Sequence, residues 1–205
     1  MKYITVSLIL LVFASSLASA NVSVLGRVDT IGAGDPCYTV GLTDSKTGIE
    51  LWALGLPDFP DLEVGKTWLV KKLSSEKTQV YFSGYAVIWP KAEPRSQYFL
   101  LPWPSLTTKI GSAKLTADAF AYVPLNGGPV CVGTNDTGIS WPVGNKLQLG
   151  ASATYWKQEG CEHMAGIGPQ AVWSLTQDAS LTIRYIPDNL GTDSSFRVQF
   201  NCAIF

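Results

Sequence analysis

The chain has 205 residues, of which 15 are Lys or Arg and 16 are Asp or Glu. This balance excludes the basic field that nucleic acids or anionic membranes attract, and a 46% hydrophobic composition excludes intrinsic disorder. Neither a phosphate-binding loop nor the glycine pattern of dinucleotide-binding proteins occurs in the sequence. We therefore expect no cofactor and no nucleic-acid partner.

Residues 1–20 have the pattern of a cleavable export signal. Lys2 supplies the positive start, Ile4–Phe13 is apolar, and Ala18-Ser19-Ala20 matches the A-x-A cleavage site. The apolar run is shorter than the ~20 residues that a helix needs to cross a bilayer, and no later segment is longer. We expect a secreted or cell-surface protein without a transmembrane segment, in which residues 21–205 form a single domain.

Apolar and polar residues alternate along the mature chain with a period of two, which is typical of β-strands that bury one face. The alternation is clearest in the last ten residues. One face there comprises Phe196, Val198, Phe200, Cys202 and Ile204. The other face comprises Arg197, Gln199 and Asn201. We predict a strand whose apolar face lies in the protein core.

Further runs rich in β-branched and aromatic residues predict other strands. In chain order they are 22–28, 38–42, 49–54, 67–73, 78–89, 113–122, 147–155, 171–176 and 181–185. Residues 113–122 also fit helical spacing, but we favour a strand. About ten short strands separated by turn sequences indicate an antiparallel sandwich or barrel, and we predict a β-sandwich of immunoglobulin-like or jelly-roll type.

Four of the 12 prolines fall within residues 89–104, which we predict to be a stiff loop crossing between two sheets. Trp89, Trp103 and Trp141 each directly precede a proline, a context that favours extended backbone at strand ends. A Trp at the rim of a sandwich can plug its open end or offer a flat face to a sugar or a protein. These three are the predicted binding residues, with Trp103 foremost.

The four cysteines of the mature chain are Cys37, Cys131, Cys161 and Cys202. An even number of cysteines in an exported chain predicts two disulfides, with three pairings open. The sequence contains neither a C-x-x-C motif nor a cluster of Cys and His residues, so we predict no metal site.

No group of residues identifies an active site. His163 is the only histidine, and no G-x-S-x-G motif is present. Glu159 and Glu162 are the closest pair of glutamates, but they share one loop, whereas catalytic carboxylates project from separate strands. We expect no catalytic residues; a small carbohydrate-active enzyme and an inhibitor presenting a stiff loop remain the alternatives. Asn135 is a predicted N-glycosylation acceptor if the source is eukaryotic.

The mature amino terminus reads Asn-Val-Ser-Val-Leu-Gly-Arg-Val over residues 21–28 and is followed by Cys37. Together with the alternating strand at the carboxyl terminus, it resembles a bacterial chaperone–usher fimbrial subunit. The resemblance implies an immunoglobulin-like fold completed by a strand of a neighbouring subunit, with glycan binding by tip members. The 94-residue gap between Cys37 and Cys131 departs from that family. We expect adhesion or fimbrial assembly, with like subunits and a protein or glycan ligand at a cell surface as partners.

Overall fold

The computed structural model describes residues 22–31, 35–56, 61–90, 96–161, 163–187 and 194–204. The predicted export signal, residues 1–20, lies outside them. The described strands are β1 Val22–Ile31, β2 Cys37–Asp44, β3 Ile49–Leu56, β4 Asp61–Leu69, β5 Thr78–Trp89, β6 Gln97–Ile110, β7 Ala113–Asp118, β8 Phe120–Pro124, β9 Cys131–Pro142, β10 Leu147–Gln158, β11 Met164–Ser174, β12 Ala179–Ile186 and β13 Ser195–Ile204. A short 3-10 helix, η1, spans Lys71–Leu73. Among these residues no helix is long and apolar enough to cross a membrane.

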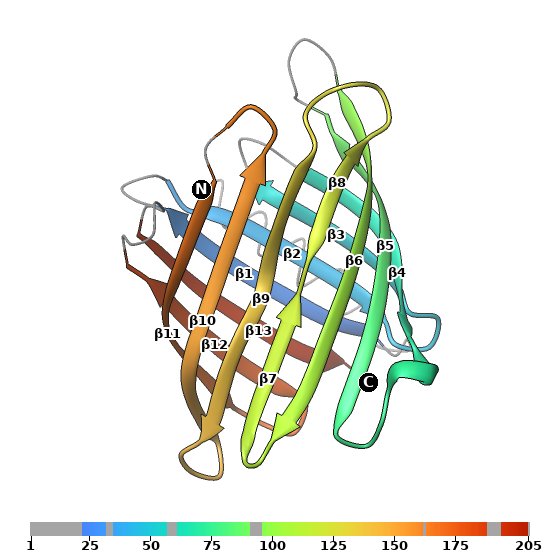
Figure 1. Cartoon of the computed structure of the whole chain (residues 1–205). Helices are drawn as coiled ribbons and strands as arrows, with labels where there is room; N and C mark the ends of the chain where they lie inside the picture. The colour runs from blue at the N-terminus through green and yellow to red at the C-terminus, as the bar shows by residue number, and fades with distance from the viewer. Residues whose placement is uncertain are drawn as a thin grey trace.

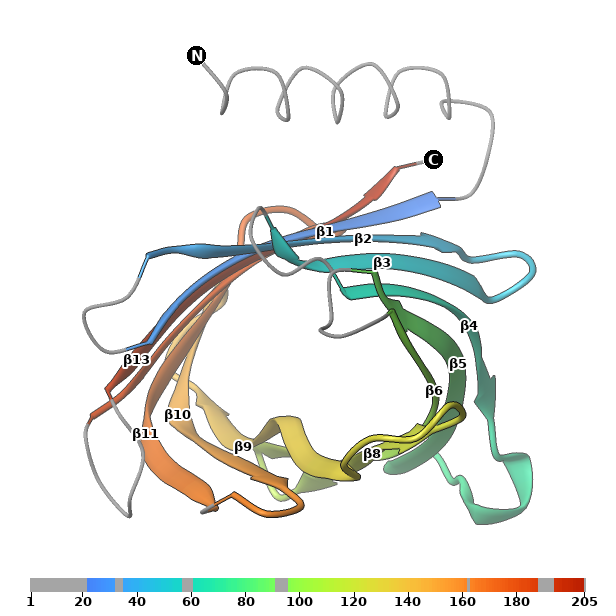
Figure 2. The same cartoon turned by 90° about the horizontal axis from the view of Figure 1, so that it is seen from above.

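The strands form one closed antiparallel ring (Figures 1 and 2). β1 pairs with β13 along its whole length, so the first and last strands join. β7 and β8 follow each other along the same position between β6 and β9, separated by Ala119. The thirteen strands therefore occupy twelve positions, and the fold is a 12-stranded barrel.

The two ends of the barrel differ in their connections. At one end β1 begins and β13 ends, and the turns there are 45–48, 70–77, 111–112, 143–146 and 175–178. The connections at the opposite end are 32–36, 57–60, 90–96, 125–130, 159–163 and 187–194. We call these the turn end and the loop end.

The predicted β-sandwich is wrong, because one sheet closes on itself and no second sheet packs against it among the described residues. Residues 89–104 do not cross between sheets either. The described residues of this range belong to the β5–β6 hairpin, in which Trp89 pairs with Gln97 and Gly84 with Pro102. β6 accommodates its prolines because residues 101–104 pair with β5 but with neither β7 nor β8. The strand predicted over 113–122 is confirmed as β7 and β8.

The alternation predicted in β13 is confirmed, but the face assigned to the core is wrong. Phe196 and Phe200 lie on the outer face, with 43% and 41% of their surface exposed. Arg197 and Gln199 line the interior. The same inversion holds for β10 and β12, where Leu149 and other apolar side chains point outward. A closed barrel has only an inside and an outside, so polar residues that fill the interior leave their apolar neighbours on the outer wall.

One side of the interior is filled by a hydrophobic cluster from β5, β6, β8 and β9. Its buried members are Tyr85, Val87, Phe99, Leu101, Tyr122 and Cys131. Partly buried aromatic side chains packed against them are Trp52, Trp89, Trp103, Phe120 and Trp156. Phe99 is completely inaccessible to solvent. This cluster, here named the aromatic side, is the core of the described structure.

The two predicted disulfides are wrong, because Cys37, Cys131, Cys161 and Cys202 are all free. On β1, the residue paired with Cys37 is Asp29 and the residue paired with Cys202 is Val24. Five strand residues extend over about 17 Å, which greatly exceeds the Cα separation of about 7 Å that a disulfide can bridge. The even number of cysteines alone cannot reveal that the barrel places Cys202 at a different height from Cys37.

Candidate functional site

The barrel interior contains two adjoining cavities of about 680 and 730 Å³. The first lies toward the loop end, where Asp61 and Gln97 begin their strands, and the second extends to Lys114 and Gln148 near the turn end. The residues that line both cavities are Arg27, Thr39, Leu54, Asn135, Trp156 and Arg184. The two cavities therefore meet at this level, where each of these residues is the third to fifth of its strand counted from the loop end.

At the same level, β9 departs from regular pairing in the barrel wall and forms a β-bulge. Its pairing with β10 shifts between Thr134 and Thr137, so Asn135 and Asp136 face a single residue of β10. Residues 134–137 also pair with neither β7 nor β8. A Cβ on Gly138 would lie 2.7 Å from the carbonyl oxygen of Ala151, so only glycine permits this close approach beside the bulge. Such bulges redirect side chains, and this one directs Asn135 into the interior.

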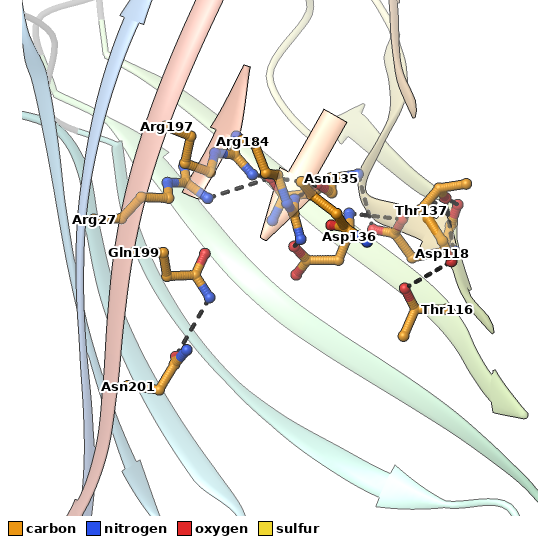
Figure 3. Close-up of polar contacts among 12 residues, drawn as sticks. Arg27, Thr116, Asp118, Asn135, Asp136, Thr137, Arg184, Arg197, Gln199 and Asn201 are labelled. Atoms are coloured by element: carbon orange, nitrogen blue, oxygen red, sulfur yellow. Dashed lines mark hydrogen bonds and ion pairs between the residues drawn. The ribbon is translucent and has the colours of Figure 1, made fainter. Parts of the chain in front are cut away.

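Asp118, the last residue of β7, holds the bulge in place (Figure 3). Its carboxylate accepts the backbone N–H groups of Asn135 and Asp136, each at 2.9 Å. It also accepts the hydroxyl of Thr137 and the indole N–H of Trp103, both at 2.9 Å. Because the β7–β8 position is interrupted beside Asp118, the backbone amides of the bulge have no strand partner there, and the Asp118 carboxylate accepts their hydrogen bonds instead.

Three arginines from β1, β12 and β13 bind the other side of the bulge (Figure 3). Nη1 of Arg184 donates to the carbonyl oxygen of Asn135 at 2.8 Å, and its Nη2 lies 2.8 Å from Oδ1 of Asp136. Nη1 of Arg197 donates to Oδ1 of Asn135 at 2.8 Å, and Nη1 of Arg27 donates to the same oxygen at 3.2 Å.

Asp29 on β1 completes this network. Its carboxylate forms ion pairs with Nε of Arg27 at 2.6 Å and Nε of Arg197 at 2.5 Å. We name the whole network the latch; its members are Arg27, Asp29, Asn135, Asp136, Arg184 and Arg197. Since it joins β9 to β1, β12 and β13, which are not its neighbours in the sheet, the latch spans part of the interior.

Carboxylates on the aromatic side are held by neutral donors. Glu50 accepts the indole N–H of Trp52 at 3.0 Å and the hydroxyls of Thr67 and Tyr85 at 2.5 and 2.6 Å. The phenol oxygen of Tyr122 lies 2.8 Å from Glu63 and 3.0 Å from Asp61. The interior thus presents polar groups over the hydrophobic cluster as well as at the latch. Nowhere in the described ranges do three His, Cys, Asp or Glu side chains form a group suited to a metal ion.

The three predicted binding tryptophans do not converge on one site. Trp89 and Trp103 face the interior from β5 and β6, whereas Trp141 lies on the outer wall, 47% exposed. Trp103 is central in a strand and packs against Phe120 and Tyr85, so the expected stiff loop around it does not exist. The binding roles of these residues stay predictions.

Other candidate residues lie apart from the latch, with one exception. Asn135, the predicted glycosylation acceptor, uses its side-chain oxygen within the latch. His163 is exposed and stacks on Tyr155 with ring centroids 6.4 Å apart. Glu159 accepts the backbone N–H of Val130 at 3.4 Å, and Glu162 lies outside the described residues.

Sequence reasoning missed the three arginines, Asp118 and Asp136 as a group. Two signals were present. Arg184 and Arg197 lie on the polar faces of alternating strands, where a long charged side chain is unusual. Two glycines, Gly133 and Gly138, flank the Asn-Asp pair within one strand, which is a sequence sign of a bulge.

By sequence, no known protein family matches the chain, and no curated protein matches it. Solved structures match its fold. The KdgM porin aligns with 8% identity and a TM-score of 0.59 over 89% of this chain and 99% of that chain. A structure of the KdgM porin in complex with disordered oligogalacturonate gives 7% identity and a TM-score of 0.60, with the same coverage of both chains. The outer membrane protein Omp33 of Acinetobacter baumannii gives 12% identity and a TM-score of 0.51 over 90% of this chain and 98% of that chain.

The chain has the barrel fold of these proteins. At such low identity the similarity concerns the fold alone, but it extends over nearly the whole length of each protein. It overturns the resemblance to a chaperone–usher fimbrial subunit, which rested on the termini. The predicted adhesion or fimbrial-type role is wrong with it, because a closed barrel has no missing strand for a neighbouring subunit to supply.

Proposed function

We propose that the protein is a channel for polar solutes in a bacterial outer membrane. The observation that carries the proposal is the inverted alternation around a closed barrel. Eleven of the thirteen strands place large apolar side chains on the outer wall, among them Leu51, Val64, Leu100, Val132, Leu149 and Ile183. In water such an apolar surface would cause aggregation, whereas it is the surface expected of a barrel that faces lipid.

The dimensions and the aromatic residues support the same proposal. A membrane-spanning strand needs about 9–11 residues, and most strands of this barrel have 8 to 14. The exposed tryptophans Trp68, Trp141 and Trp173 gather near the turn end. The exposed tyrosines Tyr98, Tyr155 and Tyr185 gather near the loop end. Two such girdles are typical of outer-membrane barrels, where amphipathic rings lie at the two interfaces.

Export and orientation follow from the same reasoning. The signal over residues 1–20 delivers the chain across the inner membrane, and the outer membrane is where closed barrels insert. Barrels of this kind have short turns on the periplasmic side and longer loops outside. The turn end is therefore periplasmic and the loop end external in our proposal, which replaces the expected secreted protein without a transmembrane segment.

Oligosaccharides are the solutes that the interior favours. Its two cavities combine aromatic side chains, including Trp89 and Trp156, with charged and amide groups of the latch. Aromatic faces stack on sugar rings, and amides and guanidinium groups bind sugar hydroxyls. The structural relative KdgM was solved in complex with an oligogalacturonate, which supports the same solute class for this chain.

Reconstitution tests the proposal. The mature chain, refolded into lipid vesicles, should allow small sugars to enter, measured by osmotic swelling, and should produce discrete current steps in a planar bilayer. Protein that has been heat-unfolded and not refolded is the control. If the folded chain and every latch variant described below pass neither sugars nor ions, the proposed function is wrong.

A further inference from the structure

The latch occupies the level at which the two interior cavities meet. Arg27, Asn135 and Arg184 line both of them, and Asp118 fixes the bulge behind Asn135. A solute that moves from one cavity to the other must pass these side chains. On the proposed channel function, the latch therefore lies directly on the route of transport.

We propose that the latch is the selectivity constriction of the channel and that it sorts solutes by size and not by the sign of their charge. This inference rests on the proposed function and deepens it. It assigns the specificity to a segment of the barrel wall, residues 134–137 of β9, and to the residues that hold this segment.

The charge balance of the constriction carries the second half of the proposal. The three arginines of the latch, Arg27, Arg184 and Arg197, are balanced by its two aspartates, Asp29 and Asp136, together with Asp118, which holds the bulge from the other side. Selective rings in channels carry an excess of one sign. Here the formal charges cancel, and opposite charges at 2.5 to 2.8 Å leave little net field for a passing ion.

Those donors of Arg184 and Arg197 that face the bulge and Asp29 are also already engaged. Arg184 holds the carbonyl of Asn135 and the carboxylate of Asp136, while Arg197 holds Asn135 and Asp29. An anionic solute would have to replace these partners to bind, and it would release the bulge in doing so. The main role of the guanidinium groups is therefore to position the constriction, and attraction of anions is secondary.

Variants that remove one negative or one positive charge from the latch test the proposal that the constriction does not select by charge. Asp136→Asn leaves an excess positive charge at the constriction, and Arg184→Gln leaves an excess negative charge. In a KCl gradient, the wild-type reversal potential should lie near zero, with Asp136→Asn shifting it toward anion selectivity and Arg184→Gln toward cation selectivity. Lys114→Gln, which changes a charge in the turn-end cavity away from the latch, is the matched control and should shift it much less.

Reducing the bulk of the constriction tests size selection. Asn135→Ala removes the side-chain oxygen that Arg27 and Arg197 hold, so larger neutral sugars should enter vesicles than wild type admits. Gln199→Ala is the matched control, because Gln199 lines the interior on β13 and its side-chain amide donates to Asn201, outside the latch. Its sugar cut-off should equal that of wild type.

The outcomes separate this inference from the function on which it rests. Each variant is first shown to be folded by the slower migration of its unheated form on a denaturing gel or by its far-UV spectrum. A conducting wild type with an unchanged reversal potential in both charge variants, or an unchanged sugar cut-off in Asn135→Ala, overturns the inference and leaves the channel intact. A silent wild type with conducting latch variants also overturns it, because the latch then closes the route to every solute and sorts none, while the variants still show the barrel to be a channel.

Discussion

The two sides of the barrel interior are held together by different kinds of contact. On the aromatic side, Phe99 and Leu101 are fully buried among other rings, and Tyr122 packs edge-on against Phe99. On the latch side, Arg184 and Arg197 cross to the β9 bulge through ion pairs and hydrogen bonds. The comparison teaches that one half of the interior works as a protein core and the other half as a polar surface.

This difference has a physical consequence for transport. Apolar side chains that leave a packed cluster lose burial worth about 1.5–3 kcal/mol each, so the aromatic side holds its shape. A hydrogen bond to a charged group, as in the latch, contributes a similar net amount of about 1.5–3 kcal/mol, but the polar groups of water or of a solute can replace a lost partner. A polar solute can therefore exchange with contacts of the latch more easily than it can displace the aromatic side, where it offers no replacement contact.

The strongest test of the comparison removes the centre of the aromatic side. Phe99→Ala should lower the free energy of unfolding by about 3–5 kcal/mol, because the ring leaves a cavity among side chains that cannot collapse. Urea titration of the refolded barrel in lipid vesicles measures it. Phe196→Ala, on the outer wall, is the control and should lose less since lipid fills the space. Equal losses in the two variants would contradict a packed core on that side.

A second test distinguishes the outer wall from the interior. Ile183→Arg places a charge on the outer face near the middle of β12 and should cost about 2–4 kcal/mol, the penalty for an arginine facing the centre of a bilayer. Gln199→Arg adds the same charge inside the barrel and is the matched control. Both are measured as the yield and stability of folding into vesicles. If Ile183→Arg inserts as stably as Gln199→Arg, the outer wall does not face lipid.

The smallest expected effect lies where the two sides meet. Trp103 belongs to the hydrophobic cluster, and its indole N–H donates to Asp118, which holds the bulge. Trp103→Phe keeps an aromatic side chain, with a smaller ring, but removes this hydrogen bond to a carboxylate, whose loss should cost about 1.5–3 kcal/mol. Trp141→Phe on the outer wall is the control and should cost less. If the Trp103→Phe barrel is as stable as wild type, the hydrogen bond to Asp118 does not stabilise the contact between the aromatic side and the bulge.

Local features of the fold could be predicted well. Residues 78–89 are a strand with the predicted bounds, and 147–155 and 181–185 lie within β10 and β12. Two long strands were missed for identifiable reasons. β6 contains Pro102 and Pro104, which argue against a strand, and β9 contains glycines and the Asn-Asp pair, which are typical of turns.

The latch could not be predicted, because its members are far apart in the sequence. Arg27 and Asn135 are 108 residues apart, and Arg197 is 168 residues from Asp29. Strand periodicity places each arginine on a polar face, but it does not say which other strand that face meets. Only closure of the ring, with β13 beside β1, brings the arginines together opposite the bulge.

By itself the sequence determined the period of two, the turns, and which residues share a face of each strand, since these depend on neighbours along the chain. It could not determine which face points inward. An alternating strand has the same sequence pattern whether its apolar side packs in a water-soluble core or lies on the outside of a barrel. The period of two shows only that the two faces of the strand differ. The tertiary structure decided this. With twelve strand positions closed into a ring around polar side chains, Phe196 and Phe200 have no place except the outer wall.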